Sequence, residues 1–168
     1  MNNLKHKVML MLVYSAGLRV GEVVRLKTED VDSKRMLIHI KGSKGRKDRY
    51  VMLSEVALEI LRGYWRKYKP EKWLFEGARV GRHLSTRTVE KILEDACKKA
   101  GTKKDVSVHT LRHNFATHLL EGGTDLRYIQ ELLGHKDSKT TEIYTHVSTK
   151  NIGKIKSPLD TLNLKKGK

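Results

Sequence analysis

Three basic side chains stand close together in the stretch His109-Thr-Leu-Arg112-His113. If this stretch is helical, residues three and four positions apart are neighbours, so the three side chains fall on one face. Apolar residues fall on another face, which is expected to be buried, namely Leu111, Phe115 and Leu119. Positive charges held together repel one another unless an anion meets them, so this helix predicts an anion-binding site. We take the anion to be a phosphate of DNA.

A second candidate group lies downstream of this helix. The run Leu133-Gly134-His135 is expected to end a helix at the glycine and present the histidine, and Tyr144 follows nine residues later. Tyr144, the tyrosine just downstream of His135, is the candidate nucleophile. The other tyrosines are expected to be ordinary half-buried aromatic residues.

Arg19 and Glu22 form a third group near the start of the chain, in Gly17-Leu18-Arg19-x-x-Glu22. Arg19 sits at the junction of two predicted helices, where two packed elements can position its side chain. Glu22 follows by three residues, so its carboxylate can reach back to Arg19 or cap a backbone group.

A basic hairpin and a basic loop supply further cations. Glycines at 42 and 45 predict a turn between two strands, and such a hairpin can lie against a DNA groove. Taken alone, a lysine-rich turn is more simply a solvated turn. The basic residues of interest here are Lys41, Lys44, Arg46 and Lys47 in the hairpin and Arg82 in the loop 77–84.

The composition is strongly biased toward basic residues. The 168 residues include 35 Lys and Arg against 19 Asp and Glu, a formal net charge of +16. Such an excess of one sign indicates a polyanionic partner, most often a nucleic acid. The highly charged surface of a heat-stable protein would explain many charges of both signs, but not this imbalance. The length predicts one domain with a core of its own.

Several classes of protein are disfavoured by the same sequence. Cys97 is the only cysteine, which excludes an internal disulfide framework and favours a reducing compartment, the cytoplasm. No stretch is long and apolar enough to span a bilayer, and no broad amphipathic face suits a membrane surface. The N-terminal apolar run is interrupted by His6 and Lys7, so it predicts a helix rather than a signal peptide.

Hydrophobic periodicity predicts mostly helices with one β-hairpin. Trp65 and Leu126 are expected on the buried faces of their helices, and residues 73–75 could add a third strand. Ser138 and Ser157-Pro158 are expected to start two short C-terminal helices. The remaining helices are predicted over about residues 3–16, around 20–24, 55–69, 86–100, 109–121 and 126–133, with strands over 36–40 and 49–53.

These motifs together resemble the catalytic domain of the tyrosine recombinases (phage-integrase-like), and most closely their Xer-type branch. The resemblance covers residues 1–147 and rests on five motifs in this order: Gly17-Leu18-Arg19-x-x-Glu22, the hairpin with Lys44, His109-x-x-Arg112-His113, Leu132-Leu-Gly-His135 and Tyr144. It implies an α+β, mainly α fold, in which a small antiparallel sheet (the hairpin at about 35–53) packs against a helical core.

The resemblance also implies roles in breaking and rejoining DNA strands. Arg19 and Arg112 would grip the scissile phosphate, with His109 assisting proton transfer and His135 donating a hydrogen bond. Tyr144 would attack phosphorus to give a 3′-phosphotyrosyl link. The covalent link conserves the bond energy, so no metal, ATP or other cofactor is implied. Further implied residues are Lys44 as general acid, with Lys41 and Lys47 as competitors for that role, Glu22 and His113 as supports, and Lys41, Arg46, Lys47 and Arg82 as DNA-binding residues.

The family's organisation gives further expectations. Its members carry an N-terminal DNA-clamp domain, which is expected to be absent here, and residues 148–168 are expected to form a tail that docks on its own or a neighbouring subunit. The implied partner is double-stranded DNA, bound by a homotetramer on paired recombination sites, with a monomer or weak dimer when free. Phage integration and chromosome dimer resolution are both compatible with the motifs.

Three alternatives remain beside the recombinase. A type IB topoisomerase-like enzyme would use the same residues on one duplex, and a DNA-binding module would use the basic surface without catalysis. The spacing of His109 and His113 is also that of a zinc-binding helix. That motif needs a glutamate after the first histidine, where Thr110 stands, so zinc is disfavoured.

Overall fold

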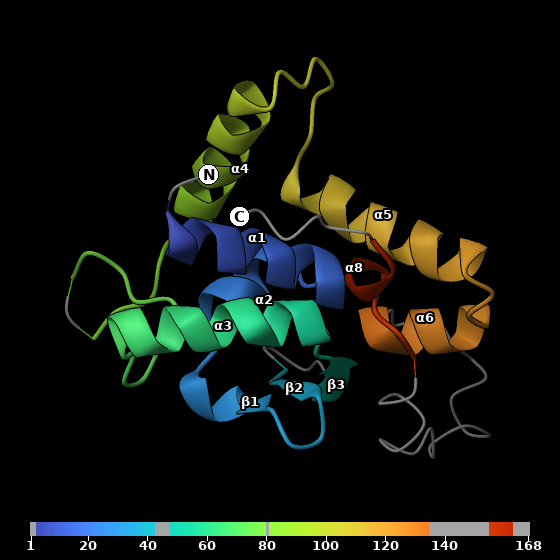
Figure 1. The fold of residues 1–168 in the computed structure, drawn as a ribbon, viewed down its shortest axis with the longest axis horizontal. Coiled ribbons are helices and arrows are strands. Elements are labelled where there is room, and N and C mark those ends of the chain that lie inside the picture. Colours follow the sequence, from blue (N-terminus) through green and yellow to red (C-terminus); the bar gives the residue numbers. More distant parts are fainter. Residues whose placement is uncertain (1–2, 43–47, 80, 135–154, 163–168) are drawn as a thin grey trace.

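The computed structural model describes residues 3–42, 48–79, 81–134 and 155–162, and these ranges form a helical core with a small sheet below it (Figure 1). The helices are α1 (Leu4–Ala16), α2 (Val20–Val24), α3 (Glu55–Tyr68), α4 (Thr86–Lys99), α5 (Val108–Glu121), α6 (Leu126–Leu133) and α8 (Pro158–Thr161), with a 3-10 turn at Thr28–Asp30. The strands are β1 (Val31–Asp32), β2 (Leu37–Ile40) and β3 (Arg49–Met52). The mainly helical α+β fold predicted from the sequence is confirmed.

The sheet is antiparallel in the order β1-β2-β3. Its long pair is the predicted hairpin, in which Leu37 lies opposite Met52 and Ile40 lies opposite Arg49. The prediction of a third strand at 73–75 was wrong. There, Trp73 makes only an isolated bridge to Lys27, and the third strand is β1, which is too short to show a period-two pattern in the sequence.

Helix α1 is the centre of the core. Figure 1 shows it running between α3 on one side and α5 on the other, and its buried residues make contact in both directions. Asn3 caps its start, because the side-chain oxygen accepts from the backbone N–H of His6. Gly17 ends it in the left-handed conformation, as predicted. Both helix ends therefore follow from local sequence, and burial on two sides makes this helix the scaffold for the others.

Two predicted core positions are corrected by the structure. Trp65 is 41% exposed, and Tyr64 is buried in its place, where its hydroxyl donates to the carbonyl of Leu74 at 2.8 Å. Burial of a tyrosine is tolerated when its hydroxyl finds such an acceptor. Leu126 is 54% exposed, because it is the first residue of α6 and precedes the turn that packs.

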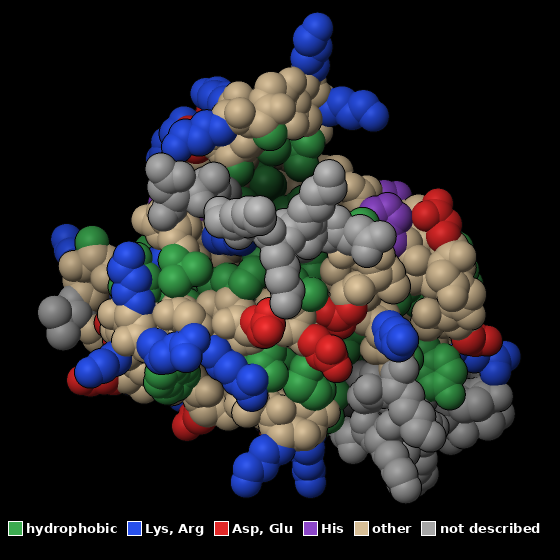
Figure 2. All heavy atoms as spheres, in the orientation of Figure 1, with side chains coloured by type: hydrophobic (Ala, Val, Ile, Leu, Met, Phe, Trp, Pro, Cys, Tyr) green, Lys and Arg blue, Asp and Glu red, His purple; other side chains and the backbone are tan. Residues whose placement is uncertain are grey.

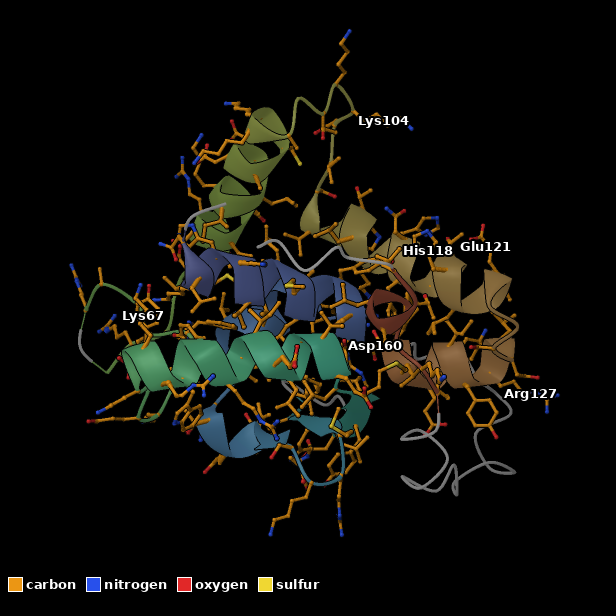
Figure 3. The ribbon with its side chains drawn as sticks, viewed as in Figure 1. Lys67, Lys104, His118, Glu121, Arg127 and Asp160 are labelled. Carbon is orange, nitrogen blue, oxygen red and sulfur yellow. The ribbon has the colours of Figure 1, made fainter. Side chains whose placement is uncertain are left out.

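The C-terminal part of the described chain packs on its own core. The predicted helix start at Ser157 is confirmed, and its hydroxyl donates to the carbonyl of Ser15 at 2.8 Å. Leu159 is buried against the helical core. The Asp160 carboxylate accepts from the backbone N–H of Val56 at 3.1 Å and so caps the first turn of α3, where Figure 3 places it. This segment therefore joins the start of α3 to the end of α1.

We expect Gly17→Ala to be more destabilising than an ordinary glycine replacement in the left-handed region. Gly17 has φ +60°, and an added Cβ would lie 2.5 Å from Cδ1 of the buried Phe115. The left-handed backbone costs an L residue about 1–2 kcal/mol, and overpacking adds about 1–3 kcal/mol. Urea unfolding measures the loss.

Gly123→Ala is the matched control. Gly123 has φ +81°, and among the described residues no atom lies within 4 Å of an added Cβ. Gly123→Ala therefore has the same free-energy cost for the left-handed backbone as Gly17→Ala, but no steric clash of the added Cβ. Equal losses for the two variants would show that the close approach of Phe115 to Gly17 is unimportant.

Candidate active site at the end of helix α6

Three arginines converge on the last turn of α6, where each donates to one of three consecutive backbone carbonyls. Arg49 Nε donates to the first at 2.8 Å, Arg112 Nη2 to the second, and Arg19 Nη2 to the third at 3.2 Å. The three acceptors are, in order, the carbonyls of Leu132, Leu133 and Gly134. The last carbonyls of a helix have no partner within it and carry the negative end of its dipole, so cations stabilise them.

The three arginines reach this point from separate elements. Arg19 is the residue before α2, Arg49 is the first residue of β3, and Arg112 lies in the second turn of α5. Gly134 ends α6 with φ +61°, which directs the chain away from the helix axis. The predicted glycine stop is thus confirmed, and the residue that follows it, His135, lies outside the described residues.

Glu22 is the carboxylate of this cluster. Arg49 grips it with both terminal nitrogens, Nη1 to Oε1 at 2.8 Å and Nη2 to Oε2 at 2.9 Å. Arg19 donates to it twice, from Nη1 to Oε1 at 3.0 Å and from its backbone N–H to Oε2 at 2.8 Å. Glu22 therefore both caps the start of α2 and holds the Arg19 side chain, the two contacts considered for it in the sequence.

The cluster sets the charge of Glu22. Burial of this carboxylate acts to raise its pKa, but hydrogen bonds and charge from Arg49, followed by hydrogen bonds from Arg19, lower the pKa to about 2. The side chain is only 9% exposed and is ionised at neutral pH. Its negative charge compensates part of the positive charge of Arg19 and Arg49.

Arg112 is the most deeply placed of the three arginines. Only 4% of the residue is exposed, and Nη1 donates to the carbonyl of Gly17, the residue that ends α1. Arg19, by contrast, has a side chain that is 28% exposed. Arg112 therefore joins the ends of α1 and α6, whereas Arg19 stands at the edge of the cluster.

The predicted histidines of α5 lie on its outer side. His109 and His113 are exposed, whereas Arg112 between them is buried. Ser107 caps the helix, because its hydroxyl accepts from the backbone N–H of Thr110 at 3.1 Å. The cap stabilises the first turn of α5. His109 lies in this turn, and Arg112 lies one turn further along the same helix.

Lys41 is engaged in ion pairs at the base of the hairpin. Its Nζ lies 2.8 Å from Oε1 of Glu29 and 2.9 Å from Oδ1 of Asp30. Hydrogen bonds from Lys41 to Glu29 and then to Asp30 raise the pKa of this lysine above its usual range. A general acid needs a pKa near the working pH, so these contacts argue against Lys41 in that role.

The remaining predicted residues are spread over the surface or lie outside the described part of the chain. Arg82 is exposed in the loop before α4. Asp48 closes the hairpin, because Oδ1 accepts from the backbone N–H of Gly42 at 2.8 Å. Lys44, Arg46, Lys47, His135 and Tyr144 are outside the described residues.

Basic side chains are not confined to this site. Figure 2 shows Lys and Arg at several places around one face, including over α3 and around the end of α4. Charge alone therefore does not mark where a partner binds. In the described ranges, no three His, Cys, Asp or Glu side chains are grouped closely enough to hold a metal ion. None of the helices described is both long and apolar enough to cross a membrane.

The chain matches the Phage integrase family over residues 1–151 and belongs to that family. Tyrosine recombinase XerA of Pyrococcus horikoshii is 44% identical over 154 residues, which are 90% of this chain and 53% of that protein. The crystal structure of a XerA recombinase superposes with a TM-score of 0.75 and 37% identity over 86% of this chain and 53% of that one. The predicted resemblance to Xer-type tyrosine recombinase catalytic domains is thereby confirmed.

A structure of the XerH site-specific recombinase is also similar. It was solved bound to difH substrate before cleavage, with a TM-score of 0.70 and 32% identity over 85% of this chain and 43% of that one. This chain thus spans about half the length of the relatives it matches.

Arg49 is the member of the cluster that sequence reasoning missed. Its local sequence predicts only the first residue of a strand, and nothing in that pattern marks a partner. Glu22 lies 27 positions away and the Leu132 carbonyl 83 positions away, so both contacts depend on tertiary structure. A charged residue at the first position of a half-buried strand is the one signal that the sequence offers.

We expect Glu22→Gln to destabilise the protein by on the order of 2–3 kcal/mol at neutral pH, because the arginines lose their ionised partner. The folded pKa of about 2 lies below the ordinary value of 4.5. The carboxylate therefore contributes stability that is fully present above pH 4.5 and is lost as the pH falls toward 2. The difference between wild type and variant should shrink over that range.

Urea unfolding at a series of pH values measures this difference. Glu94→Gln is the control, because Glu94 is an exposed carboxylate paired with lysines on α4. A wild-type-to-Glu22→Gln difference that stays constant with pH would contradict the ionised state assigned to Glu22.

Proposed function

We propose that this chain is the catalytic domain of a site-specific DNA recombinase that breaks and rejoins strands through a 3′-phosphotyrosyl intermediate. The observation that carries this proposal is the convergence of Arg19 and Arg112 at the end of α6, directly before His135. Guanidinium groups match the oxygens of a phosphodiester and keep their protons at any working pH. Membership of the phage integrase family supports the same conclusion.

The proposed chemistry follows from the charge that the reaction develops. The Tyr144 oxygen attacks phosphorus, the bond from phosphorus to the 5′ oxygen breaks, and Lys44 gives a proton to that leaving oxygen. His109 assists removal of the phenolic proton, and His135 donates to a phosphate oxygen. Donors that are already in place where negative charge grows typically contribute a few kcal/mol each. The preorganised arginines would therefore stabilise the transition state.

The proposed partner is double-stranded DNA. The net charge of +16 supports a polyanion, and the similar XerH recombinase was solved on its difH substrate. We propose that four copies act on two paired sites, with residues 148–168 as a docking tail of the catalytic domain at 1–147. The similarity to Xer recombinases supports chromosome dimer resolution as the proposed biological role.

The first test is covalent trapping on duplex DNA. Nicked, end-labelled duplexes with candidate sites are incubated with the protein, in the presence of chelator, and then denatured. We expect a protein–DNA adduct with wild type and none with Tyr144→Phe, since the phenol oxygen is the attacking atom. Tyr128→Phe, a change on α6, is the control and should still form the adduct.

The products also separate the alternatives. Strands joined between two differently labelled duplexes indicate a recombinase, whereas strands resealed only within one duplex indicate a topoisomerase-like enzyme. Salt-sensitive binding without an adduct on any substrate would reject the catalytic proposal and favour a DNA-binding module.

A second prediction assigns the general acid. A substrate with sulfur in place of the bridging 5′ oxygen has a better leaving group and needs no acid. Lys44→Ala should slow cleavage of the oxygen substrate by about 10²–10⁴-fold and recover on the sulfur substrate. Lys41→Ala should keep the wild-type ratio of the two rates, because Lys41 is held by Glu29 and Asp30. If the sulfur substrate restored the cleavage rate of Lys41→Ala but not that of Lys44→Ala, Lys41 would be the general acid.

A further inference from the structure

Arg49 uses one planar side chain to hold two separate parts of the cluster. Its Nε donates to the Leu132 carbonyl at 2.8 Å, and its two terminal nitrogens hold both oxygens of Glu22 at 2.8 and 2.9 Å. The side chain is 11% exposed, so these bonds are sheltered from water. In the chemistry proposed above, Arg49 itself has no role.

We propose that Arg49 is a positioning residue that holds Arg19 and the chain leaving α6 in the geometry that catalysis requires. It acts through Glu22 on the one side and through the Leu132 carbonyl on the other. The catalytic consequence rests on the proposed function, whereas the contacts themselves do not.

The first step runs through Glu22. Oε1 is shared between Arg49 Nη1 and Arg19 Nη1, and Oε2 between Arg49 Nη2 and the backbone N–H of Arg19. A carboxylate held at both oxygens by a rigid fork cannot rotate. Arg19 therefore meets an acceptor in a fixed place, and its partly exposed guanidinium is oriented before any phosphate arrives.

The second step runs through the end of α6. An added Cβ at Gly134 would lie 3.1 Å from Cδ of Arg49, so the arginine side chain packs against this glycine. Together with the bond to the Leu132 carbonyl, this packing sets the position of the last turn of α6. His135 is the next residue in the sequence, so Arg49 holds the helix end to which His135 is attached.

The third step runs along β3. Arg49 pairs with Ile40 in the antiparallel sheet and begins the strand that follows the hairpin residues 43–47. Figure 1 shows β3 beside α6. Lys44 belongs to this hairpin in the sequence, and His135 follows α6. Arg49 thus connects the base of the hairpin with the end of α6. One side chain connects the segments that carry three of the proposed catalytic groups.

A simpler role for Arg49 is charge compensation for the buried Glu22. The two roles predict different results for the substitution Arg49→Lys. A lysine keeps the positive charge but presents a compact ammonium rather than a planar fork, so it cannot reproduce all three bonds in the same directions. Arg49→Lys therefore separates charge from geometry.

The experiment is a double-mutant cycle on the 168-residue chain. Arg49→Gln and Arg49→Lys are made in the wild-type and Arg19→Ala backgrounds, and Arg66→Gln, an exposed change on α3, controls for the loss of one positive charge. Three quantities are measured: the urea unfolding free energy, the affinity for duplex DNA at fixed salt, and the single-turnover rate of adduct formation.

We expect Arg49→Lys to remain folded and to form the adduct more slowly by on the order of 10²-fold, as misplacement of a catalytic group typically does. Either change at Arg49 should reduce the adduct rate and the DNA affinity less in the Arg19→Ala background than in wild type. The reason is that part of the effect of Arg49 depends on the position of Arg19. A full rate with Arg49→Lys, or equal costs in both backgrounds, would overturn the proposal.

Failure of the proposed function gives a different result. If wild type forms no adduct on any duplex, the recombinase proposal fails, and the affinity cycle still decides whether Arg49 positions Arg19 as a phosphate ligand. If Arg49→Gln does not fold, the double-mutant cycle is measured with Arg49→Lys alone.

Discussion

The negative end of α6 and the arginines that meet it are the interaction on which the rest of the structure depends. A helix that ends inside a protein leaves carbonyls without partners, and such groups are costly when water does not reach them. Here each of the last three carbonyls receives a guanidinium from a different element. The ends of α1 and α6, the start of α2, strand β3 and helix α5 must therefore all reach one place.

Among the described residues, the same cluster brings together three arginines and one carboxylate. Arg19 and Arg49 share Glu22, whose low pKa keeps it ionised, and all three arginines also donate to backbone carbonyls. Buried charge is tolerated when it is well hydrogen-bonded, and these arginines are. A phosphate arriving at the partly exposed Arg19 would complete this balance. The contacts that satisfy the helix ends thus support the phosphate site proposed above.

The packing around the cluster explains why it can be rigid. Helix α1 is buried between α3 and α5, and its C-terminal residue Gly17 lies against Phe115 while its carbonyl accepts from Arg112. The described C-terminal segment adds to this frame, because Ser157 and Asp160 bond to the end of α1 and the start of α3. Catalysis by preorganised donors requires such a frame, since donors that must be reoriented during the reaction stabilise the transition state less.

Most of the helices, the hairpin and the family can be predicted from local patterns in the amino-acid sequence. Caps such as Ser54 and Ser107, the glycine stops at 17 and 134, and the apolar periodicity act within a few residues, so they can be seen in the chain. Where local patterns were ambiguous, as at Trp65, Leu126 and residues 73–75, the predictions failed, because burial depends on which neighbour is present.

The long-range pairing of the charged residues, by contrast, depends on the tertiary structure. Arg19 and Glu22 lie three positions apart, and their contact was foreseeable. The bonds from Arg49 to Glu22 and from Arg112 to Gly17 join residues 27 and 95 positions apart. Lys41 looked like a free cation of a basic hairpin but is held by Glu29 and Asp30. Long-range electrostatic pairing leaves no local pattern in a chain with so many charges, so the distant partners of Arg49 and Arg112 were set by the fold alone.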